Sequence, residues 1–212
     1  AWKKVIELLT ANTPNGKKIS IMLEEIGYKY KVTKVNINKD EQFKPEFRKL
    51  SPFSKIPIII DHDKKQSLFE SGAILIYLGE KSGKFYEKSQ RTVINQWLMG
   101  QMAYVGPMLG QHHQFHHYNS GKSKFGEERY FKISERIYNE LDYRLSSSKF
   151  LAGKNYTIAD IATFPWIARH DWHDIGLKRF KNLLRWYEEI AKREKVKKGY
   201  DLLKKGEKVP LP

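Results

Sequence analysis

The sequence predicts an α/β domain followed by an all-helical domain, and three observations support this division. The first half carries short apolar runs in the order strand–helix–strand and then strand–strand–helix. Parallel strands need a crossover helix, and residues 19–26 supply one between the first two strands. After Thr92 the apolar residues recur at helical spacing. We therefore expect domains over residues 1–82 and 90–212, joined by a polar linker.

Each element of the first domain has its own local signal. The apolar residues 5–9 predict the first strand, and the turn formers at residues 11–16 end it. The helix that follows is apolar on one face and ends at Gly27. Alternating polarity over residues 30–37 predicts the second strand, and the β-branched residues 58–60 predict the third.

The second domain shows two long amphipathic segments and one capped helix. Residues 93–109 form the first segment, which we expect to break at Gly106–Pro107, and residues 127–145 form the second. Thr157 stands three residues before Asp160, which is the spacing of a capping box. We assign these two residues a structural role, because they fix the start of a helix.

The composition excludes several classes of function. The chain has 212 residues, of which 40% are hydrophobic, and this is enough for a folded core. It has no cysteine, which rules out disulfides, thiolate metal ligands and a catalytic cysteine. No apolar stretch approaches the roughly 20 residues of a membrane helix, and the first residues do not resemble a secretory signal. We therefore expect a cytoplasmic protein.

The formal net charge of +15 favours anionic ligands. Basic residues outnumber acidic ones in both halves of the chain, so the excess is not confined to a tail. We interpret the charge as a lysine-rich surface. No zinc-finger, P-loop or RNA-binding aromatic motif accompanies it, and we expect no specific nucleic-acid partner.

Two short segments carry most of the functional information. Pro57 opens a β-branched run, and a proline there often marks a cis peptide bond that leaves the backbone of Ile56 facing outward. Glu70, Ser71 and Gly72 stand just before a helical run, and a helix N-terminus attracts a carboxylate. Together the segments suit a small peptide with a free carboxylate. Separately, they could be a buried strand, a turn and an ordinary capped helix.

At this spacing the two segments resemble those of glutathione transferases. In that family a thioredoxin-like N-terminal domain precedes a helical C-terminal domain, and glutathione is the co-substrate. The residue before the proline pairs its backbone with the cysteinyl part of glutathione, and a Glu-Ser pair holds the γ-glutamyl end. The resemblance implies these roles for Ile56, Glu70 and Ser71, and it implies a homodimer.

The turn at residues 13–18 lies where this family keeps its sulfur-activating group. Thr13, Asn15 and Lys18 match a Thr-x-Asn-x-x-Lys pattern, similar to that of the bacterial Nu class, which reduces disulfides with glutathione and without a protein cysteine. The Thr13 hydroxyl and the Asn15 amide can donate hydrogen bonds to a thiolate, and the helix start adds positive potential. The resemblance implies glutathione contacts for Asn15 and Lys18. Taken alone, the segment could be a simple helix-initiating turn.

Further resemblance to the Nu class extends along the chain. It implies that Gln42 contacts the glycyl carboxylate region of glutathione and that Arg129 contacts a charged end of the ligand. Arg129 could equally be a solvent-facing arginine on a helix. Asn12 departs from the pattern of bacterial relatives, which puts the geometry of the neighbouring turn in question.

A histidine-rich run lies in the second domain. The pairs His112–His116 and His113–His117 have the i,i+4 spacing that can bind a metal on a helix. A zinc site needs a third ligand, and neither a cysteine nor a helical acid accompanies the run. We therefore expect no metal, and we expect these histidines to line the cleft between the domains.

The resemblance implies a glutathione-dependent disulfide reductase. One bound glutathione, deprotonated with help from Thr13 and Asn15, would attack a small disulfide, and a second glutathione would resolve the mixed disulfide. Two alternatives stay open. One is conjugation of glutathione to an electrophilic substrate, and the other is a non-catalytic glutathione-binding or regulatory relative.

Overall fold

The computed structural model describes residues 6–212, which form two compact units. The first unit contains the chain up to Lys84 together with Arg193–Lys208, and the second contains Phe85–Lys192 and Val209–Pro212. Residues 193–208 therefore pack with the first unit, whereas the sequence analysis placed all of residues 90–212 in the helical domain.

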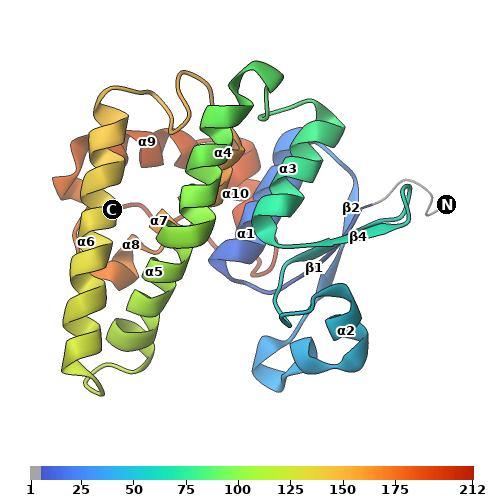
Figure 1. Ribbon diagram of the computed structural model, residues 1–212, viewed down its shortest axis with the longest axis horizontal. Helices are drawn as coiled ribbons and strands as arrows, with labels where there is room; N and C mark the ends of the chain where they lie inside the picture. Colours follow the sequence, from blue (N-terminus) through green and yellow to red (C-terminus); the bar gives the residue numbers. More distant parts are fainter. Residues whose placement is uncertain (1–5) are drawn as a thin grey trace. The chain divides into compact units, whose positions relative to one another are not determined.

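The first unit is built on a four-stranded mixed sheet with the strand order β2-β1-β3-β4 (Figure 1). The strands are β1 (Ile6–Thr10), β2 (Tyr30–Lys34), β3 (Ile58–Asp61) and β4 (Gln66–Phe69). β1 runs parallel to β2, with Leu8 opposite Val32, and antiparallel to β3, with Leu8 opposite Ile59. β4 closes the sheet as the antiparallel partner of β3. This thioredoxin-like arrangement confirms the predicted α/β domain.

The helices α1 (Pro14–Ile26) and α2 (Pro45–Leu50) lie between these strands, and α3 (Ser71–Ser82) follows β4. α1 is the crossover between the parallel strands β1 and β2, and α3 packs against it (Figure 1). Side chains alternate along a strand, so Leu8 and Leu9 point to opposite faces of the sheet. Leu9 joins a cluster with Phe47 of α2 and Ile58 of β3, which shows that α2 covers the face that Leu9 occupies.

β2 is shorter than the sequence predicted. The alternating pattern extends over residues 30–37, but the strand ends at Lys34. Two 3-10 turns come soon after it, η1 (Ile37–Lys39) and η2 (Glu41–Phe43). The Asn36 side chain accepts from the Asn38 N–H at 3.2 Å, and the Asn36 N–H donates to the Glu41 carboxylate at 2.7 Å. These local hydrogen bonds compete with hydrogen bonding between strands, so alternating polarity alone overestimates the length of the strand.

Helix α10 (Glu194–Asp201) packs along α1 within the first unit. Gly199 allows the close approach, because a Cβ at this position would lie 2.6 Å from the Ile21 Cα and 2.7 Å from the Ile21 nitrogen. The Arg193 guanidinium donates two hydrogen bonds to the Glu25 carboxylate, at 2.6 and 2.9 Å. These contacts hold residues 193–208 against the sheet unit.

The second unit is helical. Its α-helices are α4 (Arg91–Gly100), α5 (Gly106–His112), α6 (Lys124–Ser146), α7 (Ile158–Ile167), α8 (His170–His173) and α9 (Lys181–Ala191). Two π-helical segments, η4 (Gln101–Val105) and η5 (His113–Tyr118), and two 3-10 turns, η3 (Lys88–Gln90) and η6 (Leu177–Arg179), connect them. In the part of the chain that the structure describes, no helix combines the length and the apolar character needed to cross a membrane.

α7 lies at the centre of this unit, and all of its residues are buried. The capping box predicted from the sequence is present: the Thr157 hydroxyl accepts from the first turn, and the Asp160 carboxylate accepts from the Thr157 N–H at 2.9 Å. Asp160 also accepts from the Leu151 N–H and the Trp186 indole N–H, both at 2.9 Å. Burial raises the pKa of Asp160, while these hydrogen bonds act in the opposite direction.

The helix expected to break at Gly106–Pro107 continues through these residues. The helix continues because η4 forms a π turn, in which the Gly106 N–H donates to the Gln101 carbonyl, five residues earlier. This π turn comes directly before Pro107, which then lies in the first turn of α5, where a missing N–H costs little.

We expect Gly199→Ala to lower the free energy of unfolding by about 1–3 kcal/mol, because the new methyl group would overlap the backbone of α1. Urea unfolding followed by circular dichroism measures the change. Gly100→Ala is the matched control, since Gly100 also lies in a helix but a Cβ there meets nothing within 4 Å. We expect that control to be neutral or stabilising. Equal effects of the two substitutions would contradict the close α1–α10 contact.

Candidate functional site

Thr13 forms the N-cap of α1 at the end of β1. Its backbone is extended, and its hydroxyl oxygen accepts a hydrogen bond from the Gly16 N–H at 3.1 Å. A hydroxyl that accepts in this way keeps its own proton to donate. Asn15 lies half-buried in the same first turn, behind Pro14. Both predicted sulfur-activating residues are therefore at one helix start.

Gly16 holds this turn against the end of β1. A Cβ at Gly16 would overlap the Ala11 carbonyl oxygen and would lie 2.5 Å from the Thr10 hydroxyl oxygen. The sequence analysis treated Gly16 only as a turn former, and its role in this close approach needed the structure. The neighbouring Asn12, which departs from the family pattern, is exposed and donates to the Glu207 carboxylate at 3.1 Å.

Ile56 and Pro57 precede β3, and the peptide bond between them is cis. Ile56 is half-buried and packs beside Phe47 and Ile58. The loop before it is fixed by Ser51, whose hydroxyl donates to the Lys55 carbonyl at 2.9 Å and accepts from the Lys55 N–H at 3.1 Å. This brings the backbone of Ile56 to the start of an inner strand of the sheet.

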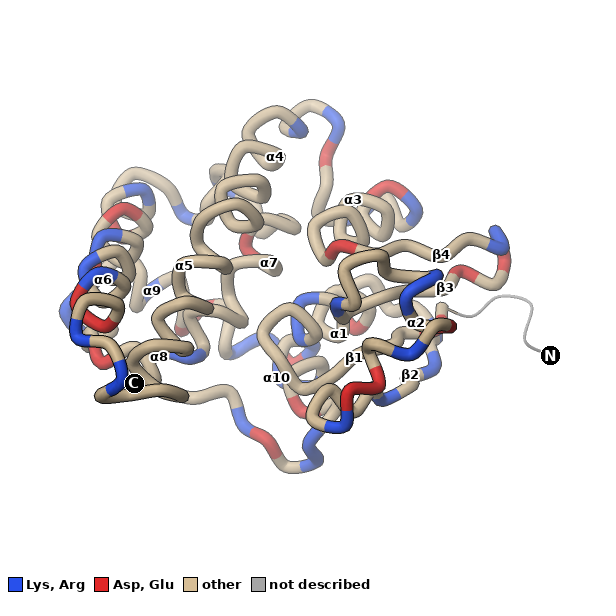
Figure 2. The backbone as a smooth tube through the Cα atoms, turned by 60° about the horizontal axis from the view of Figure 1, so that its bottom comes forward, with Lys and Arg blue, Asp and Glu red and all other residues tan. Residues whose placement is uncertain are grey.

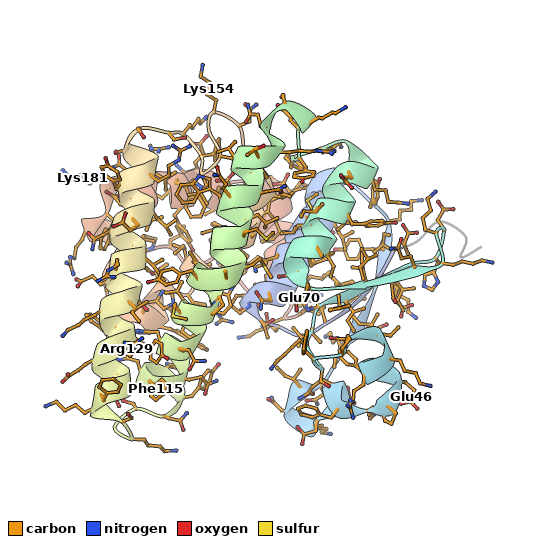
Figure 3. The ribbon with its side chains drawn as sticks, in the orientation of Figure 1. Glu46, Glu70, Phe115, Arg129, Lys154 and Lys181 are labelled. Atoms are coloured by element: carbon orange, nitrogen blue, oxygen red, sulfur yellow. The ribbon has the colours of Figure 1, made fainter. Side chains whose placement is uncertain are left out.

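Glu70 and Ser71 form the start of α3. Figure 3 shows Glu70 at this end of the helix. Glu70 is the N-cap residue, with φ of 67° and ψ of 116°, and its side chain makes no capping hydrogen bond. Ser71 is the first helical residue and is only 3% exposed. The first turn of a helix leaves backbone N–H groups without intrahelical partners, and such a start favours a carboxylate.

Lys18 connects α1 to this helix start. Its side chain is 1% exposed, and its ammonium nitrogen Nζ donates to the Ser71 hydroxyl oxygen at 3.1 Å. Burial lowers the pKa of Lys18 to about 7, and the nearby Glu70 carboxylate opposes this effect. The sequence pattern named Lys18 as a glutathione contact, but it gave no sign of its contact with Ser71.

Gln42 lies on η2 with its amide nitrogen bonded to the Ile37 carbonyl at 3.3 Å. Its amide oxygen is buried and meets no hydrogen-bond partner among residues 6–212. The structure therefore places Gln42 in a turn of the first unit with part of its hydrogen-bonding capacity unused.

Arg129 lies on α6 in the second unit (Figure 3). There it lines a pocket of about 500 Å³ that combines aromatic, aliphatic and charged side chains. The lining residues are Tyr104, Met108, Phe125, Glu128, Arg129, Lys132, Ile133 and Arg136. Basic and acidic residues are interspersed along α6 (Figure 2), but three of the four charged residues at this pocket are basic. The pocket therefore favours an anionic ligand with apolar parts.

The expectation that the histidine run lines a polar cleft is wrong for its first two members. His112 is fully buried, and His113 is 6% exposed. The His113 Nε2 lies 2.8 Å from the His173 Nε2, and the His173 Nδ1 lies 2.7 Å from the Tyr138 hydroxyl, so η5, α6 and α8 meet in a buried polar chain. Residues 6–212 contain no group of three or more His, Asp or Glu side chains that could hold a metal.

The comparisons with known proteins cover both units. Residues 5–80 match the family model of the glutathione S-transferase N-terminal domain, and residues 109–194 match that of the C-terminal domain. The chain belongs to the glutathione S-transferase family. The chain is 43% identical to the disulfide-bond oxidoreductase YfcG of Escherichia coli over 207 residues, which cover 94% of this chain and 95% of YfcG. This relative agrees with the resemblance to the Nu class.

Two crystal structures show how similar the fold of this chain is to that of other members of the family. A glutathione transferase from Burkholderia graminis with two glutathione molecules per subunit has a TM-score of 0.89 and 38% identity, covering 96% of this chain and 90% of that one. A glutathione transferase from Pseudomonas putida with one glutathione disulfide per subunit has a TM-score of 0.87 and 40% identity. The match covers 94% of this chain and 92% of that one.

We expect the protein to lose stability as the pH falls below about 6.5. Burial lowers the pKa of His113 to about 3 and that of His173 well below its ordinary value, so the unfolded chain binds protons that the folded chain does not. Between pH 7 and 4.5 the free energy of unfolding should fall by about 2–3 kcal/mol for one such histidine. Urea unfolding at a series of pH values measures this.

The variants His113→Gln and His117→Gln separate this effect from the general acid sensitivity of carboxylates. His113→Gln should lower stability at pH 7 and flatten the dependence on pH, because one of the two buried histidines that titrate on unfolding is gone. His117 is exposed in the same segment, so its replacement should leave the slope unchanged. If the free energy of unfolding of His113→Gln changed with pH as steeply as that of the unmodified protein, this explanation would be refuted.

Proposed function

We propose that this protein binds glutathione at the sheet unit and uses the glutathione thiolate to reduce small disulfides. The observation that carries the proposal is the start of α1, where the Thr13 hydroxyl caps the helix through its oxygen and keeps its proton to donate. A thiolate placed there meets the Thr13 hydroxyl, the Asn15 amide and the positive end of α1. Because the chain has no cysteine, the reacting sulfur must come from the ligand.

Glutathione would lie along the segment from Ile56 to Ser71. The backbone of Ile56 would pair with the cysteinyl residue of the ligand, as the cis-proline segment suits a short extended peptide. The Ser71 hydroxyl and the first-turn N–H groups of α3 would bind the γ-glutamyl carboxylate, and the Glu70 carboxylate would bind the γ-glutamyl ammonium. Gln42 would contact the glycyl end, and Lys18 would act on the γ-glutamyl end.

The reaction would proceed by two thiol–disulfide exchanges. The bound thiolate attacks one sulfur of the substrate disulfide, a new S–S bond forms, and the other sulfur leaves as a thiolate that takes a proton from solvent. A second glutathione thiolate then attacks the mixed disulfide and yields glutathione disulfide and the second reduced thiol. Two glutathione molecules thus supply the two electrons. The relatives support this scheme, because one was crystallised with two glutathione molecules and another with glutathione disulfide.

Arg129 would bind a charged end of glutathione. The basic side chains around its pocket attract carboxylates, and the aromatic and aliphatic residues there can accept the apolar part of a second substrate.

We expect Thr13→Ala and Asn15→Ala each to reduce turnover about ten- to a hundredfold, while glutathione affinity changes less. Loss of one hydrogen bond to an anion costs about 1.5–3 kcal/mol, and here it is lost where the thiolate reacts. Reduction of hydroxyethyl disulfide by glutathione, coupled to glutathione reductase, measures turnover. Thr13→Ser is the matched control, because it keeps both the helix cap and the hydroxyl donor.

The same assay decides between the alternatives. If the unmodified protein does not exceed the uncatalysed rate, the reductase proposal fails, and conjugation to chlorodinitrobenzene becomes the next activity to measure. If glutathione binds but neither reaction is accelerated, the protein is a glutathione-binding or regulatory member of the family.

The proposal includes assembly into a homodimer, with cytoplasm as the predicted location. The dimer rests on the resemblance to glutathione transferases, which pair their subunits. We expect light scattering at micromolar concentration to give twice the chain mass of 25.0 kDa. A single-chain mass under these conditions would contradict the dimer.

A further inference from the structure

The turn that carries Thr13 begins before α1 does. Residues 11–13 belong to neither β1 nor α1, and the Thr13 N–H donates to the Ala11 carbonyl at 2.8 Å. The Lys17 N–H then donates to the Thr13 carbonyl at 2.9 Å and closes the first turn of the helix. A segment outside the regular hydrogen bonding of a helix or sheet is mobile unless side-chain contacts hold it.

One carboxylate oxygen bonds to both ends of this turn. The Glu207 Oε2 accepts from the Asn12 amide at 3.1 Å and from the Lys17 ammonium at 2.8 Å. Asn12 and Lys17 stand on either side of residues 13–16. An acceptor that binds a donor on each side restrains the segment between the two donors.

Glu207 is itself held in place by the segment that carries α10. Its N–H donates to the Asp201 carboxylate and to the Lys204 carbonyl, both at 2.9 Å. Gly206 has a φ of 86°, and this left-handed backbone turns the chain just before Glu207. α10 packs along α1 in the same unit (Figure 1). The side chains of Lys17 and Glu207 are only 2% and 15% exposed, so solvent screens this ion pair less than a surface pair.

The charged groups near the turn come from α1, from the start of α3 and from the C-terminal segment. Lys17 of α1 pairs with Glu207 of the C-terminal segment. Lys18 of α1 interacts with Glu70 at the start of α3. Replacing Glu207 therefore changes the local charge as well as the contacts of the turn, and an experiment must separate these two effects.

We propose that Asn12 and Glu207 are positioning residues, which hold the turn so that the Thr13 hydroxyl faces the sulfur of bound glutathione. This inference rests on the proposed function, which places the thiolate at this turn. Asn12 and Glu207 act through the position of Thr13 and not through contact with the ligand. The inference also gives a role to Asn12, the residue that departs from the pattern of bacterial relatives.

Amide hydrogen exchange in the ligand-free protein tests whether these contacts hold the turn. We expect Asn12→Ala and Glu207→Ala to speed exchange about three- to tenfold at the hydrogen-bonded N–H groups of residues 13–17, because the turn opens more easily. Glu194→Ala is the matched control, since it removes an exposed, ion-paired acid of α10 and should leave these rates unchanged. Exchange as slow in Asn12→Ala and Glu207→Ala as in the unmodified protein would overturn the inference.

Reduction of hydroxyethyl disulfide by glutathione, in the coupled assay, tests the effect on the reaction. We expect Asn12→Ala to lower kcat about three- to tenfold, with little change in the KM for glutathione, because a displaced Thr13 hydroxyl stabilises the thiolate less. The pH profile of kcat should move to higher pH, which a loss of stability alone would not cause. In a Thr13→Ala background the same substitution should have a smaller effect, because the group that Asn12 positions is gone.

Two substitutions at Glu207 separate position from charge. Glu207→Gln and Glu207→Ala both remove the negative charge, but the glutamine keeps an oxygen that can accept from Asn12 and Lys17. We expect the pH profile of Glu207→Ala to lie at higher pH than that of Glu207→Gln. Identical profiles for the two variants would overturn the inference, because charge and not position would then account for the effect.

These measurements distinguish failure of the inference from failure of the proposed function. If the unmodified protein neither binds glutathione nor reduces the disulfide, the proposed function is wrong and the inference falls with it, whatever the exchange rates are. If it does both, but Asn12→Ala keeps the kcat and the pH profile of the unmodified protein, only the inference is wrong. Should Glu207→Ala fail to fold, Asn12→Ala decides the question, because Asn12 is exposed.

Discussion

Three consecutive buried residues at the start of α1 fix the geometry of the sheet unit. Gly16 lets the helix begin against the end of β1, Lys17 is bonded to the segment that carries α10, and Lys18 is bonded to the start of α3. Each contact needs a different residue. Gly16 has no side chain, the Lys17 ammonium meets a carboxylate, and the Lys18 ammonium meets a hydroxyl. Because these contacts come from consecutive residues of one helix turn, the turn that carries Thr13 is fixed by β1, by the segment that carries α10 and by α3.

The sequence predicted the elements whose signal is local. The strands, the crossover helix and the capping box of α7 depend on neighbouring residues, and the structure has them at the expected places. The predicted length of β2 and the predicted helix break were wrong, because in both places a local hydrogen bond competes with the structure that the sequence pattern favours. β2 ends early because Asn36 offers the backbone another hydrogen-bond partner, and a π turn carries the helix past Gly106–Pro107.

From the sequence, the candidate site could be proposed as a set of residues, but the contacts among them could not be proposed. Motif spacing pointed to Thr13, Asn15, Ile56 and the Glu70–Ser71 pair, because these residues are recognised by type. The contact between Lys18 and Ser71 joins residues 53 positions apart, and no local pattern encodes it. The buried chain from Tyr138 through His173 to His113 was missed for the same reason, since periodicity shows that a face is buried but not which polar groups meet there.

The return of residues 193–208 to the sheet unit has a consequence for the order of folding. The bond between Lys17 and Glu207 joins residues 190 positions apart, so it can form only after the intervening chain has been synthesised. During synthesis, the β-sheet can form while α1 still exposes the face that Gly199 and Tyr200 later cover. The helical unit is translated in that interval. The first unit to be synthesised is therefore the last to be completed, and until then its exposed helix face is a place where a chaperone could bind.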